Sequence, residues 1–106
     1  MTCLKYLAYR IERGRAISPE DAHFAVRDAW HLMMDGIDGN INAAVAFKDA
    51  MLPEWRWALY DDGGAWLFLP EKPTSLSPVY TRAANTARAL VVATLRALAD
   101  EREATE

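Results

Sequence analysis

Cysteine is almost missing from this chain of 106 residues, which holds only Cys3. One thiol cannot form an internal disulfide, so a disulfide-held scaffold is excluded and a reducing compartment is favoured. Catalysis by Cys3 would require a lowered thiol pKa and a neighbouring base. A helix beginning nearby could lower that pKa, but a lone cysteine near a chain start is more often a passive thiol.

Long apolar runs are also missing. No stretch approaches the roughly 20 apolar residues that a membrane-spanning helix needs. Charged residues interrupt the first apolar run, "MTCLKYLAYRIER", so we expect no signal peptide. These two absences predict a cytoplasmic protein with no membrane partner.

A strong charge of either sign is lacking. Lys and Arg number 12 and Asp and Glu number 15, which gives a net charge of −3 and argues against a general nucleic-acid binder. The charge is uneven, because Lys5, Arg10, Arg13 and Arg15 face only Glu12 within the first 16 residues.

Recognisable catalytic motifs are absent: there is no phosphate loop, dinucleotide fingerprint or nucleophile elbow. Asp61 and Asp62 precede two glycines and are typical of a turn. His31 has Asp28 and Asp35 at helical spacing, which a metal could use, but no second cluster supplies further ligands. A solvated polar face is the favoured interpretation, and we expect no catalytic residue, metal or cofactor.

Hydrophobic residues make up 52% of the chain, enough for the core of one domain over residues 1–106. Apolar periodicity and capping residues predict helices near 3–13, 19–35, 40–52 and 86–103. Strands are predicted at 55–60 and 65–69, with a third at 79–82. The order ααα-β-β-(β)-α predicts an α+β fold in which helices pack on a short antiparallel sheet.

Three of the four tryptophans lie in the predicted hairpin, "EWRWALYDDGGAWLF". Pairing Tyr60 with Ala65 across a four-residue loop aligns the large rings on one face, which predicts that they form the core. That face would hold Trp55, Trp57, Leu59, Trp66 and Phe68. The other face would hold Arg56, Ala58, Tyr60, Ala65, Leu67 and Leu69, and we expect a helix or another subunit to cover it.

The outer face of the first helix is the leading candidate contact surface. It carries Tyr6, Tyr9, Arg10 and Arg13, residue types that anchor protein interfaces and can also stack on single-stranded bases. The alternative is an ordinary amphipathic helix whose tyrosines lie against neighbours. Exposed positions on the second helix, Phe24 and His31, complete the candidate partner-binding set.

From about residue 38 to 98 the chain resembles a group of small phage and prophage proteins of the ABA-sandwich type. The matching segments are "GNINAAVAFKDAMLPEWRWALY", "AWLF" and "AANTARALVVATLRAL". The sequence departs from the group's pattern at Glu54, where glycine is usual. The resemblance implies a phage origin, an α-β-β-(β)-α core preceded by a helical extension over residues 1–35, and structural roles for Trp55 and Trp57. It implies no activity.

Together these features predict a non-enzymatic phage or prophage accessory protein in the cytoplasm of a bacterial host. It would bind a host or phage protein, for example to inhibit a defence complex as anti-CRISPR proteins do. The first alternative is a small nucleic-acid-associated regulator that uses the basic first helix, and the second is an uncharacterised enzyme. A homodimer is compatible with all three.

Overall fold

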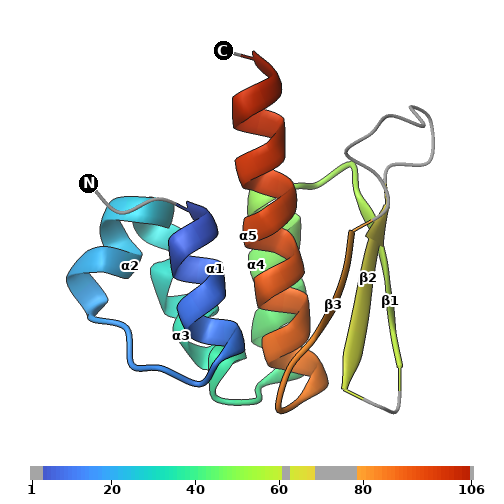
Figure 1. The fold of residues 1–106 in the computed structure, drawn as a ribbon, viewed down its shortest axis with the longest axis horizontal. Coiled ribbons are helices and arrows are strands. Elements are labelled where there is room, and N and C mark those ends of the chain that lie inside the picture. Colours follow the sequence, from blue (N-terminus) through green and yellow to red (C-terminus); the bar gives the residue numbers. More distant parts are fainter. Residues whose placement is uncertain (1–3, 61–62, 69–78, 106) are drawn as a thin grey trace.

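The computed structural model describes residues 4–60, 63–68 and 79–105, and it has the predicted α+β fold (Figure 1). A three-stranded antiparallel sheet in the order β1-β2-β3 lies on one side of the long helix α5. The shorter helices lie on the other sides of α5. In chain order the elements are α1 (Leu4–Glu12), α2 (Pro19–Val26), the 3₁₀ turn η1 (Arg27–Ala29), α3 (Trp30–Ile37), α4 (Ile41–Met51), β1 (Arg56–Leu59), β2 (Gly64–Phe68), β3 (Val79–Arg82) and α5 (Thr86–Thr105).

Side-chain hydrogen bonds cap the first turn of three of the helices. The Ser18 hydroxyl accepts a hydrogen bond from the Asp21 N–H at 3.1 Å, and the Asn40 side chain accepts one from Ala43. Asn85 accepts one from the Arg88 N–H at 2.8 Å. Each bond satisfies a backbone donor that the first helical turn leaves without a partner.

The segment predicted as one helix over residues 19–35 is two helices separated by η1, so this prediction was wrong. Arg27 has φ 56°, a left-handed conformation that residues other than glycine rarely adopt, and it ends α2. The break redirects the chain so that α3 packs against both α4 and α5. The apolar positions Ala22, Ala25 and Val26 of α2 are nevertheless buried.

Helix α5 is the centre of the molecule. It packs against β2 and β3 on one side and against α1, α3 and α4 on the others. Its apolar arc is wider than packing against one sheet requires, and the other helices cover the remainder. The buried residues run almost without interruption around the helix: Ala87, Ala89, Leu90, Val91, Val92, Ala93, Thr94, Leu95, Ala97, Leu98 and Ala99.

Gly36 allows α3 to approach α4 and α5 closely. A Cβ atom at this position would lie 2.7 Å from Val91 Cγ2 and 3.2 Å from the Ala44 backbone. We therefore expect Gly36→Ala to lower the free energy of unfolding by about 1–3 kcal/mol through overpacking, partly offset by the higher helix propensity of alanine. Urea denaturation checks this, with Asp35→Ala at the exposed neighbouring position as control. Equal midpoints for the two variants would contradict it.

The register of the β1–β2 hairpin differs by one residue from the predicted register. Leu59 pairs with Ala65 and Ala58 pairs with Trp66, so Tyr60 stands opposite Gly64. Gly63, with φ 85°, donates its N–H to the Tyr60 carbonyl, which closes a loop of three residues rather than four. Because side chains alternate along a strand, this shift moves Trp66 and Phe68 to the opposite face.

The face of the sheet that packs on α5 therefore carries smaller residues than predicted. Ala65, Leu67 and Thr81 are buried there, and the Thr81 hydroxyl donates to the Ala89 carbonyl at 2.6 Å, which joins β3 to α5. Trp55 is buried as predicted. Trp57 pairs with Leu67 and therefore lies on the same face of the sheet, yet it is 40% exposed. The reason is that Trp57 is on the edge strand β1, whereas α5 packs on β2 and β3. The prediction that Trp57 and Trp66 belong to the core was wrong.

No helix among the described residues is long and apolar enough to cross a membrane.

Candidate interaction surfaces

The face of the sheet turned away from α5 brings several exposed aromatic side chains together. We call it the open sheet face and define it by the positions that the register places there: Arg56, Ala58, Tyr60, Trp66, Phe68, Tyr80 and Arg82. The described helices all lie on the other side of the sheet (Figure 1). Tyr60, Trp66 and Tyr80 are 39%, 38% and 49% exposed, and Phe68 is half-buried.

The four rings of the open sheet face form a continuous strip across the three strands. Tyr60 lies next to both Trp66 and Tyr80, with ring centroids 6.4 and 6.2 Å apart. Phe68 meets Trp66 edge-on at 6.5 Å. These separations fall in the range of favourable aromatic pairs, so the rings hold one another in place. The strip is therefore an ordered surface before any partner binds.

Charge on the open sheet face is sparse and of one sign. Arg56 on β1 and Arg82 on β3 are exposed at its two borders. The described positions of this face include no acidic residue. Trp, Tyr and Arg are the residue types most enriched among the anchors of protein interfaces. An aromatic centre with charged borders is thus suited to a partner surface that is apolar in the middle and acidic at its edges.

The predicted surface on α1 is exposed, but its charged groups are already engaged. Tyr6 and Tyr9 are exposed, and the Arg13 guanidinium lies 4.6 Å from the centre of the Tyr9 ring. Arg10 donates hydrogen bonds to the Tyr6 hydroxyl at 3.1 Å and to the Ala16 carbonyl at 2.7 Å. These contacts order the two arginines locally, which favours a structural role for at least Arg10.

Helix α1 also lies far from the open sheet face, with α5 between them (Figure 1). Ion pairs fix α1 to α5, from Arg96 to Glu12 at 2.8 Å and from Lys5 to Asp100 at 3.6 Å. The structure therefore does not bring the predicted basic helix and the aromatic strip together into one surface.

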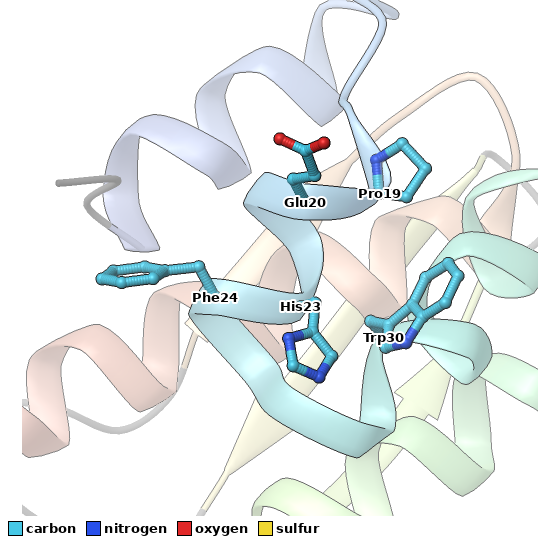
Figure 2. A pocket seen from close by; sticks show the side chains of 5 residues that line it. All are labelled: Pro19, Glu20, His23, Phe24 and Trp30. Carbon is cyan, nitrogen blue, oxygen red and sulfur yellow. The ribbon is translucent and has the colours of Figure 1, made fainter.

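Phe24 and His31 lie on the outer side of the α2–α3 region, as the sequence predicts. Phe24 is 62% exposed and borders a shallow hollow that Pro19, Glu20, His23 and Trp30 also line. Figure 2 shows Phe24 and Trp30 pointing in opposite directions with His23 between them, so the two large rings do not form a common cluster. His31 packs against Trp30 with ring centroids 3.8 Å apart.

Metal chemistry finds no support in the described part of the chain, which has no group of three His, Cys, Asp or Glu residues placed to hold an ion. Asp28, His31 and Asp35 are exposed and form no such group. Three residues weighed for catalysis, Cys3, Asp61 and Asp62, lie outside the described residues.

Sequence reasoning missed the open sheet face because it assigned Trp66 and Phe68 to the core. One signal was available in the sequence: with a three-residue loop, the large side chains of Tyr60, Trp66, Phe68 and Tyr80 all fall on one face.

No protein-family model, curated protein or solved structure matches the chain. The similarity of residues 38–98 to phage proteins, and the origin that it implies, therefore stay predictions.

Proposed function

We propose that the protein is a non-catalytic binding module that contacts another protein through its open sheet face. The observation that carries this proposal is the strip of Tyr60, Trp66, Phe68 and Tyr80, ordered by ring contacts and left uncovered by the described helices. Exposed aromatic clusters of this kind mark interaction sites in soluble proteins. Desolvation of the rings supplies the affinity, and Arg56 and Arg82 set the orientation.

A protein partner suits this face better than a single-stranded nucleic acid. Both classes of ligand use exposed rings, but a single strand also needs a positively charged groove along its backbone. The open sheet face offers only two arginines. Arg10 lies on α1, on the other side of α5, and Arg13 and Arg15 lie in the loop that follows α1. The net charge of −3 adds a weak repulsion for any polyanion.

The sequence pattern of residues 38–98 supports a bacterial host or phage protein as the partner. Inhibition of a host defence complex is the form of this function that we propose first. It requires only that the open sheet face cover a working surface of that complex, and no bond needs to be made or broken by this chain.

The decisive test compares two pairs of substitutions in the full-length chain. Trp66→Ala with Tyr80→Ala removes the centre of the aromatic strip, and Tyr6→Ala with Tyr9→Ala removes the rings of α1. A partner is captured by cross-linking in lysate of a bacterium that carries the gene, then purified, and its dissociation constant is measured for each variant. The sheet pair should weaken binding at least about 30-fold, which is the effect of losing a single anchor worth about 2 kcal/mol, and the α1 pair less than about threefold.

Two results would overturn the proposal. One is that the α1 pair of substitutions weakens binding of the partner while the sheet pair leaves it unchanged. The other is that the protein binds a labelled oligothymidine or random duplex at low salt and that the double variant Arg10→Glu/Arg13→Glu does not. This result would establish the nucleic-acid alternative. Circular dichroism and urea unfolding of all variants ensure that lost binding is not lost folding.

A further inference from the structure

A pocket separate from the open sheet face lies where α1, α3 and α5 meet, at the end of the molecule where α5 begins (Figure 1). We call it the Arg88 pocket. It has a volume of about 270 Å³ and is more enclosed than the hollow beside Phe24. This volume is slightly below the roughly 300–1,000 Å³ of sites for drug-sized ligands, so the pocket suits a small metabolite.

Aliphatic side chains from several elements form the wall of the Arg88 pocket. Ile11 comes from α1, Ile17 from the following loop, and Met34 and Ile37 from α3. The loop that closes one side is held in place: Gly14 turns the chain with φ 72°, and Arg10 donates to the Ala16 carbonyl at 2.7 Å. The wall is therefore formed before a ligand arrives, which lowers the entropic cost of binding.

Two arginines line the pocket, Arg15 and Arg88, and Arg88 is the less exposed of the two. Its side chain is half-buried, and its Nε donates to the Ile37 carbonyl at 3.1 Å, which fixes the plane of the guanidinium. The Nη1 atom lies 3.8 Å from the point where a Cβ on Gly14 would stand, so the terminal nitrogens extend beneath the loop. Among the described residues these terminal nitrogens have no hydrogen-bond or ion-pair partner. A guanidinium that is held in place through its Nε and has both terminal nitrogens available can bind a carboxylate through two hydrogen bonds.

The geometry points to a binding site for a small aliphatic monocarboxylate, with its carboxylate on Arg88 and its hydrocarbon body against Ile11, Ile17 and Met34. The Asp38 carboxylate lines the pocket as well and would repel a second negative charge placed beside it, whereas Arg15, at the exposed edge of the same pocket, adds to the attraction for the carboxylate. Two classes of molecule share this chemistry: short branched fatty acids, and aliphatic amino acids whose ammonium group Asp38 can accept. This site is independent of the function proposed for the open sheet face.

The test is a titration of the full chain, with methyl groups of Ile and Met labelled for NMR, against 4-methylpentanoate and against L-leucine. We expect at least one of them to shift the methyl signals of Ile11, Ile17, Met34 and Ile37 in a saturable way below about 10 mM, and Arg88→Gln to weaken that binding at least about tenfold. If leucine binds more tightly than 4-methylpentanoate, and this preference is lost in Asp38→Asn, the ligand class is the amino acid. If 4-methylpentanoate binds more tightly than leucine, and its affinity increases further in Asp38→Asn, the ligand class is the fatty acid.

Arg96→Gln is the matched control, because Arg96 lies on the same helix and pairs with Glu12 outside the pocket. It should leave the affinity unchanged within about twofold. Arg88→Lys retains the positive charge without the planar fork, and it should fall between the wild type and Arg88→Gln. The inference is overturned if neither compound shifts these methyl signals, or if Arg88→Gln and Arg96→Gln bind with the same affinity.

Discussion

Replacing Phe47 with alanine is expected to lower the free energy of unfolding by about 3–5 kcal/mol. Phe47 is fully buried on α4, which packs between α3 and α5. Removing its ring would leave a cavity among helices that cannot all move inward, since α5 is held on its other side by the sheet. Domains of this size are typically stable by about 5–15 kcal/mol, so the variant would retain only part of its stability.

Urea denaturation followed by circular dichroism measures this effect as a lower midpoint at an unchanged slope. Phe47→Leu keeps much of the apolar volume and should have a clearly smaller effect than Phe47→Ala. Asn42→Ala on the exposed side of the same helix should lie within about 0.5 kcal/mol of the wild type. A Phe47→Ala midpoint equal to that of Asn42→Ala would show that α4 does not pack as described.

Lys48 is expected to give the second-largest effect, although lysine is usually a surface residue. Its side chain is only 3% exposed, and its Nζ donates to the Trp55 carbonyl at 2.6 Å. This bond joins the end of α4 to the start of β1. Lys48→Met keeps a chain of similar length but leaves that carbonyl without its donor, which should reduce stability by about 1–3 kcal/mol. Lys48→Ala should reduce it further, because the buried methylene groups are also lost.

The ion pair between Lys48 and Asp49 contributes little to this effect. Nζ lies 2.7 Å from Asp49 Oδ1, but the Asp49 side chain is 60% exposed, so water screens the attraction. Asp49→Ala is therefore the control, with an expected change below about 1 kcal/mol. A loss in Asp49→Ala as large as that in Lys48→Met would mean that the ion pair, and not the bond to Trp55, is what stabilises the junction.

Local signals predicted the helices well. Ser18, Asn40 and Asn85 each accept a capping hydrogen bond at the start of a helix, and the buried face of α1 is the one that its apolar spacing indicates. Such features depend on a few neighbouring residues, so they can be identified from sequence alone. The break at Arg27 could not, because neither glycine nor proline marks it, although Arg27 has a positive φ.

The hairpin register could not be chosen from sequence for a physical reason. Either glycine of the Gly63–Gly64 pair can adopt a positive φ, so both loop lengths are compatible with the turn. The strands also carry apolar residues on both faces, with Trp57 and Leu59 alternating with Ala58 and Tyr60, so burial does not distinguish the two registers. The candidate surface depends on that register, and it therefore emerged only with the structure.

The central position of α5 has a consequence for how the chain reaches its folded state. Residues are added from the amino end, yet the helix against which the sheet and three other helices pack comes after all of them in the sequence. Until it has left the ribosome, the earlier segments expose apolar surface with nothing to cover it. Folding should therefore be completed only after synthesis of this segment, and nascent chains that stop before it should be substrates for chaperones and proteases.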